Sequence, residues 1–140
     1  MYGPHLVMEL YGCAKNLLAN ESFIYTFLDE MPDHIEMTKI SLPNVMKYLE
    51  PPHEKWGISG FVIIAESHIS VHTYPEQYFA ALDIFSCKEF DEQSALEKII
   101  SYFKPAKYDH KMFQRGFHYP VDVKKTKKII FEQRRNLALL

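Results

Sequence analysis

Two adjacent segments in the middle of the chain most restrict its fold. Residues 58–65 (ISGFVIIA) are apolar almost throughout, which is typical of a strand buried on both faces. Residues 67–74 (SHISVHTY) alternate instead, with polar side chains on one face and Ile69 and Val71 on the other. A third strand-like run, rich in aromatic residues, covers 78–87 after a Pro-Glu-Gln turn. The middle of the chain therefore predicts a β-sheet.

The flanking segments predict helices and further strands. Strands are expected over 5–12 and 107–119, and helices over 20–31 and 91–103. The stretch 36–47 is ambiguous but strand-like, and residues 50–57 contain two prolines and are expected to form a loop. Asn20 and Asp91 suit the N-cap positions of the two helices, and Pro32 and Pro105 should stop them. We expect an α+β fold, a two-layer sandwich in which a mainly antiparallel sheet carries helices on one face.

Composition narrows the class of protein. A length of 140 residues predicts one domain, 1–140, and a net charge of −2 argues against a nucleic-acid partner. No apolar run approaches the ~20 residues of a membrane-spanning helix, so we expect no membrane partner. The first five residues lack the basic start and apolar core of a secretory signal. Cys13 and Cys87 form neither a disulfide framework nor a Cys-x-x-Cys motif, so the expected location is cytoplasmic.

The last twenty residues differ in charge from the rest. Residues 121–140 hold four Lys and two Arg against Asp122 and Glu132, a net charge of +4, and their apolar residues allow a C-terminal helix. An anionic partner is one interpretation. A solvated helical face is the simpler one, because six basic residues in twenty are common on surface helices.

Several chemistries lack their sequence signals. Gly57 and Gly60 match neither the dinucleotide fingerprint nor the phosphate-binding loop, and Gly57-Ile58-Ser59-Gly60 is one residue short of a nucleophile elbow. His68 and His72 are four residues apart, but on a strand, and no ligand-spaced Cys or carboxylate pair accompanies them. We therefore expect no metal site.

Polar, reactive residues are concentrated inside the apolar strands. They are Ser59, Glu66, Ser67, His68, Ser70, His72, Asp83 and Cys87. Burying polar groups costs free energy unless they are hydrogen-bonded or used, so eight within thirty residues favour a functional site over structural hydroxyls alone. A Glu-Ser bond followed by His also has the groups for backbone self-cleavage, in which the serine oxygen attacks the preceding carbonyl and a base drives β-elimination.

These segments carry a family resemblance. Residues 57–76 and 80–87 resemble the processing and active-site segment of the short prokaryotic S-adenosylmethionine decarboxylases, and residues 5–13 resemble the opening strand of that family. The resemblance is weak beyond about residue 104.

The resemblance implies a proenzyme that cuts itself between Glu66 and Ser67. A β chain, 1–66, and an α chain, 67–140, would result, with Ser67 converted into a pyruvoyl group. That group forms a Schiff base with the α-amine of a small-molecule substrate and accepts electrons when CO₂ leaves, in place of pyridoxal phosphate or a metal. The product would serve spermidine synthesis, and the enzyme would be a homodimer.

The resemblance also implies roles for single residues. Ser59 supports processing, His72 accepts the proton during elimination, and Cys87 returns a proton to the substrate after decarboxylation. A buried structural thiol is the plainer interpretation of Cys87. Expected substrate contacts are Glu76, His5, Leu6, His53 and Trp56.

The chain departs from the family before Gly57. The family usually has an aromatic and apolar stretch there, with a phenylalanine that stacks on adenine, whereas residues 51–56 (PPHEKW) are mostly polar, leaving His53 or Trp56 to stack. Tyr74 stands where tryptophan is common. S-adenosylmethionine is the favoured substrate. Arginine or ornithine on the same scaffold stays open, as does a non-catalytic homologue that binds or regulates a partner.

The proposed processing pair creates a geometric requirement. Ser67 and His72 are five residues apart, so in a regular strand their side chains face opposite sides. If both serve one site, the chain must bend or bulge near residues 66–68.

Overall fold

The computed structural model describes residues 3–50, 55–116, 118 and 122–138. Its strands are β1 (Gly3–Tyr11), β2 (Thr38–Lys39), β3 (Asn44–Glu50), β4 (Lys55–Ala65), β5 (Ser67–Tyr74), β6 (Phe79–Ser86) and β7 (Lys107–Arg115). Its helices are α1 (Lys15–Leu18), α2 (Glu21–His34), α3 (Glu92–Phe103) and α4 (Val123–Ala138), with a 3₁₀ turn, η1, at Pro75–Gln77.

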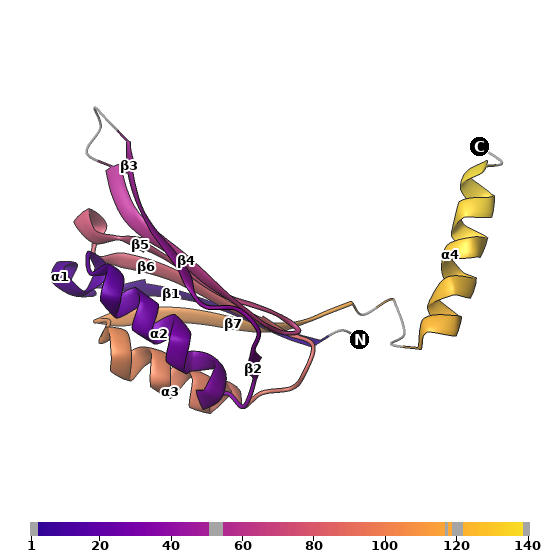
Figure 1. Ribbon diagram of the computed structural model, residues 1–140, viewed down its shortest axis with the longest axis horizontal. Helices are drawn as coiled ribbons and strands as arrows, with labels where there is room; N and C mark the ends of the chain where they lie inside the picture. The colour runs from indigo at the N-terminus through magenta and orange to yellow at the C-terminus, as the bar shows by residue number, and fades with distance from the viewer. Residues whose placement is uncertain (1–2, 51–54, 117, 119–121, 139–140) are drawn as a thin grey trace.

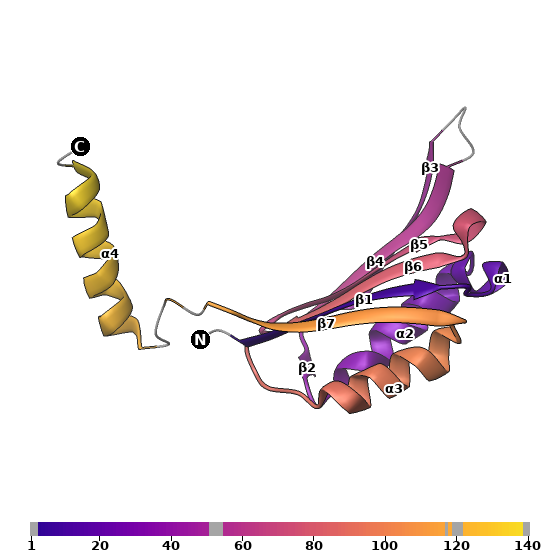
Figure 2. The ribbon, with the colours of Figure 1, turned by 180° about the vertical axis from the view of Figure 1, so that it is seen from behind.

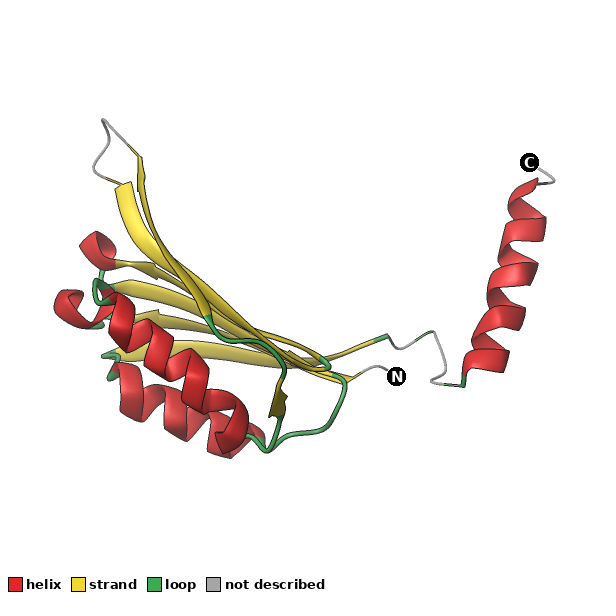
Figure 3. Ribbon diagram, viewed as in Figure 1, coloured by secondary structure: helices red, strands yellow, loops and turns green. Residues whose placement is uncertain are grey.

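The strands form one antiparallel sheet in the order β2-β4-β5-β6-β1-β7, with β3 also paired to β4. Helices α2 and α3 cover one face of this sheet, and the other face is uncovered (Figures 1 and 2). Figure 3 shows the resulting separation of a helical layer from a strand layer. The predicted α+β two-layer sandwich is confirmed. We call the uncovered side of the sheet the open face.

The core lies between the sheet and the helices. Alternate strand residues supply one side of it, such as Leu10 of β1 and Ile69 of β5, both 0% exposed. Phe27 and Leu28 of α2 and Ile99 of α3 supply the other and are also fully buried. Because every second strand residue points into this layer, the intervening residues must point to the open face.

The predicted helix starts are confirmed, but one predicted stop is wrong. The Asn20 side chain accepts a hydrogen bond from the Phe23 N–H at 3.1 Å, and Asp91 accepts one from Ser94 at 2.8 Å. Pro32 was expected to end the first helix, yet it lies inside α2, which continues to His34. Proline in the last turn deprives the helix of one hydrogen bond only, and the buried Pro32 ring packs into the core.

Two strand predictions also need correction. The segment 58–65 is not buried on both faces, because Phe61 of β4 is 41% exposed on the open face. The ambiguous segment 36–47 contains β2 and the start of β3, and β3 and β4 take Glu50 and Lys55–Gly57 from the predicted loop. The rest of that loop, 51–54, lies outside the described residues.

The C-terminal segment forms α4, as the sequence allowed. In Figures 1 and 2 α4 stands apart from the sandwich, and none of its residues is buried. No helix within the described part of the chain is both long and apolar enough to cross a membrane.

The N-cap of α2 gives a direct test of the helical layer. Asn20→Ala should lower the free energy of unfolding by about 1 kcal/mol, because the Phe23 N–H loses its acceptor. Asn20→Asp should retain most of the stability, and Asn16→Ala, an exposed position in α1, is the matched control. Urea denaturation followed by circular dichroism measures all three. Equal losses for Asn20→Ala and Asn16→Ala would contradict the assigned cap.

Candidate functional site

The predicted cleavage point lies at the tightest turn of the sheet. Strand β4 ends at Ala65 and β5 begins at Ser67, so Glu66 alone separates the two strands. Ser67 pairs with Ile64 across this turn and has a backbone φ of +113°. Residues other than glycine seldom adopt such angles, and those that do are concentrated at functional sites. The Glu66–Ser67 bond is therefore held in an unusual conformation at an accessible end of the sheet.

Cys87 lies beside this turn because Ser67 also pairs with Ser86, the last residue of β6. The Cys87 N–H donates to the Glu66 carbonyl oxygen at 3.2 Å, and the Cys87 thiol lies 3.6 Å from a Glu66 carboxylate oxygen. Partial burial raises the pKa of Cys87, and the hydrogen bond and negative charge of Glu66 raise it further. The thiol thus keeps its proton at neutral pH, as a proton donor requires.

A hydrogen-bonded group centred on Asp83 occupies the open face near the same end. One Asp83 oxygen lies 2.9 Å from His5 Nε2 and 3.6 Å from His68 Nε2, and Ser70 donates to the other oxygen. Burial by itself raises the pKa of Asp83, but the hydrogen bonds from Ser70 and His5 and the charges of both histidines outweigh it, so the net shift is downward. Asp83 is therefore an ionised carboxylate. The alternation of 67–74 indicated that His68 and Ser70 share a face, but not that Asp83 joins them.

Arg115 is a functional candidate that the sequence reasoning missed. Its guanidinium carbon lies 4.0 Å from the centre of the Phe85 ring and one of its nitrogens lies 3.5 Å from His5 Nδ1. Arg115 ends β7, which pairs with β1 rather than with the central hairpin. It was missed because it stands where the family resemblance is weak, more than 25 residues after Cys87.

Ser59 and His72 form a separate pair. Ser59 Oγ lies 2.8 Å from His72 Nδ1, directly across the β4–β5 ladder. The ladder is regular from Ser67 to His72, which places His72 about 16 Å along the strand from Ser67. The bulge that a shared site within one chain requires is therefore not found, and Ser67 and His72 of one chain lie in different places.

A third group surrounds Trp56. Its indole N–H donates to Glu76 Oε1 at 3.1 Å, and Lys15 Nζ lies 2.8 Å from the same oxygen. The hydrogen bonds from Lys15 and then from Trp56 lower the pKa of Glu76. Lys47 Nζ lies 4.9 Å from the centre of the Trp56 ring. Glu76 and Trp56, both predicted substrate contacts, are thus held together by direct contact.

Two cavities connect these groups. One of about 390 Å³ is lined by Trp56, Ser59 and His72 together with Tyr48 and Tyr74. A second of about 480 Å³ lies on the open face, where Ser70, His72 and Asp83 form part of its wall. His72 borders both cavities, so it stands between the Trp56 group and the Asp83 group.

Leu6, a predicted substrate contact, has its side chain turned away from the open face. Its side chain is 1% exposed and belongs to the core, and its backbone pairs with Ile84 on one side and Met112 on the other. His5, the preceding residue, points the opposite way and lies in the Asp83 group. His53, another predicted contact, lies outside the described residues. Within those residues no group of three or more His, Cys, Asp or Glu side chains could hold a metal ion.

The fold and the open face define an enzyme-like α+β domain, with reactive side chains on the uncovered side of the sheet. The model of the S-adenosylmethionine decarboxylase family matches residues 4–116. The S-adenosylmethionine decarboxylase proenzyme of Archaeoglobus fulgidus is 37% identical over 115 residues, covering 81% of this chain and 97% of that one. The proenzyme of Pyrococcus furiosus is 38% identical over 109 residues, covering 77% and 73%.

A solved structure agrees with these relatives. The crystal structure of the adenosylmethionine decarboxylase from Aquifex aeolicus is similar with a TM-score of 0.67 and 30% sequence identity, covering 87% of this chain and 94% of that one. The chain belongs to the S-adenosylmethionine decarboxylase family.

The contact between Glu66 and Cys87 predicts a change in thiol reactivity. In a Ser67→Ala background, Glu66→Gln should speed alkylation of Cys87 by iodoacetamide near pH 8, because losing the carboxylate lowers the thiol pKa and raises the thiolate fraction. Mass spectrometry over a pH series measures the rate. Burial raises the pKa of Cys13 to about 11, so that thiol should stay silent.

Glu89→Gln is the matched control for this experiment, because it removes an exposed carboxylate two residues from Cys87 with no hydrogen bond to the thiol. An alkylation rate that is the same in Glu66→Gln and Glu89→Gln would refute the proposed influence of Glu66.

Proposed function

We propose that this chain is the precursor of a pyruvoyl-dependent S-adenosylmethionine decarboxylase, which cleaves itself between Glu66 and Ser67. The observation that carries this proposal is the Glu66–Ser67 turn, where Ser67 has a φ of +113° and the Cys87 thiol lies 3.6 Å from Glu66. The family and the names of the relatives support it.

The turn has the groups for the first step of self-cleavage. The Ser67 oxygen attacks the Glu66 carbonyl carbon, its proton passes to the Ser67 nitrogen, and the bond from the carbonyl carbon to that nitrogen breaks to leave an ester and a free amine. Negative charge develops on the Glu66 carbonyl oxygen during the attack. The Cys87 N–H already donates to this oxygen at 3.2 Å and would stabilise that charge.

The second step requires a base. A proton leaves the Ser67 α-carbon, the bond between the Ser67 β-carbon and the ester oxygen breaks by β-elimination, and Glu66 departs as a carboxylate. Water then replaces the nitrogen of the dehydrated Ser67 residue, ammonia is released, and a terminal carbonyl remains. This carbonyl, when present, binds the α-amine of the substrate and accepts the electrons freed by loss of CO₂. Cys87 then returns a proton to the substrate α-carbon.

The position of the base supports a homodimer. His72, hydrogen-bonded to Ser59, lies too far from Ser67 of its own chain to take the proton. A two-fold axis that crosses the open face midway between these two positions of β5 would bring His72 of one copy to the strand end that carries Ser67 of the other. Phe61, Tyr74 and Phe113 are 41%, 44% and 39% exposed, and the first two flank His72 on that face. Packing two open faces together would bury them.

The walls of the smaller cavity support S-adenosylmethionine as the substrate. Tyr48, Trp56 and Tyr74 provide aromatic faces for an adenine ring and for a sulfonium cation. Glu50 in the same wall could bind the cationic side chain of arginine or ornithine instead. CO₂ release from the three labelled amino acids, measured in parallel, decides between them. The two free cysteines, Cys13 and Cys87, support a cytoplasmic location.

Mass spectrometry of the purified chain tests the proposal. The wild-type chain should yield two fragments divided at Glu66/Ser67, with a blocked N-terminus on the second. Ser67→Ala should stay intact because its nucleophile is gone. Cys87→Ala should keep the nucleophile and be cleaved, but lose turnover by about 10²-fold or more as its proton donor is removed. Cleavage of Ser67→Ala at the normal rate would falsify the assigned nucleophile.

Complementation between two variants tests the shared site. His72→Ala alone should not be cleaved. Co-expressed with Ser67→Ala carrying a different tag, it should be cleaved in the mixed dimer, because the Ser67→Ala copy supplies His72. The double variant Ser67→Ala/His72→Ala is the matched control and should give no rescue. Normal cleavage of His72→Ala alone, or a monomer by light scattering, would contradict the shared site.

A further inference from the structure

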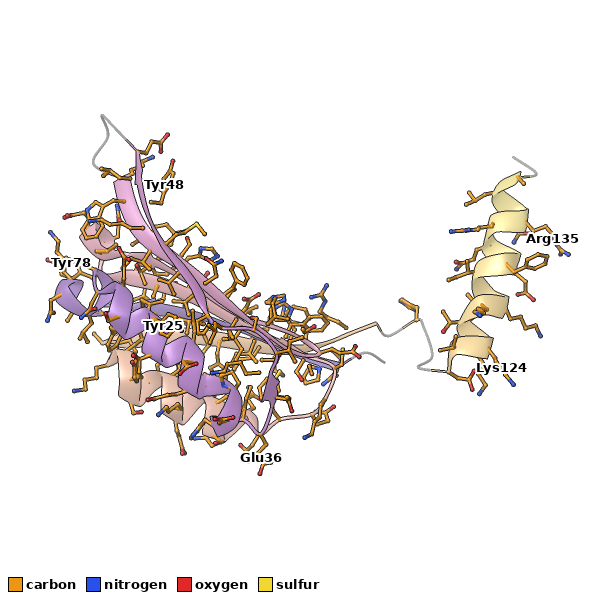
Figure 4. The ribbon with its side chains drawn as sticks, in the orientation of Figure 1. Tyr25, Glu36, Tyr48, Tyr78, Lys124 and Arg135 are labelled. Carbon is orange, nitrogen blue, oxygen red and sulfur yellow. The ribbon has the colours of Figure 1, made fainter. Side chains whose placement is uncertain are left out.

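Helix α4 is a part of the chain that the proposed decarboxylase does not use. The family match ends at residue 116, and α4 begins at Val123. Figures 1 and 2 show it separated from the sandwich, and Figure 4 shows Lys124 and Arg135 on it, far from Tyr25 of the helical layer. A 16-residue amphipathic helix placed outside the catalytic domain calls for an explanation of its own.

The charge of α4 is opposite to that of the remaining chain. Four lysines and two arginines against Glu132 give α4 a net charge of +5. Because the whole chain carries −2, the residues outside α4 carry −7. The net charge of the whole chain conceals this division, and for that reason it argued against a nucleic-acid partner.

The helix also has an exposed apolar stripe. Val123, Ile130 and Leu137 follow each other at seven-residue steps and therefore lie along one side of the helix. Val123 and Leu137 are 65% and 67% exposed, and Ile130 is 37% exposed. Phe131, a further apolar side chain of α4, is 68% exposed. An apolar stripe of this kind lowers the free energy of the protein when it leaves water.

The outer surface of the helical layer does not match this stripe. The outer side of α2 and the following turn are acidic, through Asp29, Glu30 and Glu36, and could attract α4 by charge. Among the described residues of α1, α2 and α3, however, Tyr25 is the one large hydrophobic side chain that is well exposed. The helical layer therefore has charge for α4 but little apolar surface to cover its stripe.

Pairing of α4 with the α4 of a second copy is also unfavourable. The seam of a coiled coil needs apolar residues at alternating spacings of three and four, and Thr126 and Gln133 occupy the positions between Val123, Ile130 and Leu137. Two helices of charge +5 would repel each other as well. A nucleic acid would neutralise the charge but leave the apolar stripe in water.

We propose that α4 binds an anionic lipid surface, lying in the plane of the membrane interface and tethering the decarboxylase domain to it. The stripe enters the boundary of the acyl chains while the lysines and arginines face the anionic headgroups. Lys127 and Arg134 border the stripe, and their long aliphatic stems allow the charged ends to reach the headgroups. The acidic domain, repelled by the same surface, points away from it. This proposal differs from the expectation of no membrane partner.

Vesicle sedimentation of the full chain tests this proposal. The chain should bind vesicles containing roughly 30% phosphatidylserine in phosphatidylcholine and not vesicles of phosphatidylcholine alone, and binding should weaken as salt rises. Ile130→Gln/Leu137→Gln and Lys124→Gln/Lys128→Gln should each weaken binding about tenfold or more, because each removes one of the two attractions. Ile40→Gln/Leu42→Gln, at side chains 60% and 73% exposed elsewhere on the chain, is the matched control and should bind normally.

The same set of variants also tests the two alternative partners of α4, a nucleic acid and the α4 of a second copy. Fluorescence anisotropy with duplex DNA and light scattering are run on every variant. The proposal would be overturned by an absence of vesicle binding, or by vesicle binding that Ile130→Gln/Leu137→Gln leaves unchanged. It would also be overturned by DNA binding in place of vesicle binding, or by a change of molecular mass in the α4 variants. Thermal melts show whether the variants are folded. Decarboxylase activity should be unchanged in all of them, so a failure of membrane binding can be told apart from a failure of the proposed function.

Discussion

The pairing of Ser67 on both sides is the constraint on which the rest of the site depends. Ser67 faces Ile64 across the turn at Ala65 and Glu66, and Ser86 on the neighbouring strand, so its position is fixed by two ladders at once. The same register carries Cys87 to the turn, where its N–H and thiol both meet Glu66. A slip of one residue would move Ser67 to the other face of the sheet and remove Cys87 from reach.

The same regular ladder separates the chemistry into groups. Because the β5 strand has no bulge between Ser67 and His72, the proposed nucleophile and the proposed base of one chain are far apart, and His72 instead joins Ser59 between two cavities. In the proposed dimer the open faces of two copies pack together, so His72 of one copy serves Ser67 of the other. In that proposed dimer the open face serves both as interface and as active site, which accounts for its exposed aromatic residues beside the half-buried Asp83 carboxylate.

Local sequence signals predicted most of the fold and part of the site. Caps at Asn20 and Asp91 and the alternation of 67–74 are short-range features, so the helices and the central strand could be found without tertiary information. The predicted end of the first helix at Pro32 was wrong. Packing of the buried proline in the last turn of α2 makes it tolerable there, and local sequence rules do not include such tertiary packing. Arg115 escaped notice because its place beside His5 and Phe85 arises from the pairing of β7 with β1, across more than a hundred residues.

The sequence by itself determined the class of fold and the family, and it predicted the Glu66–Ser67 bond as the cleavage point, because these depend on residue types and spacings within short segments. Only the tertiary structure decided which reactive side chains meet. It joined Glu66 to Cys87 and His5 to Asp83, placed Leu6 in the core, and kept Ser67 away from His72 of the same chain. The physical reason is that strand register and sheet order, set by burial of the apolar face against α2 and α3, fix distances between residues that are remote in sequence.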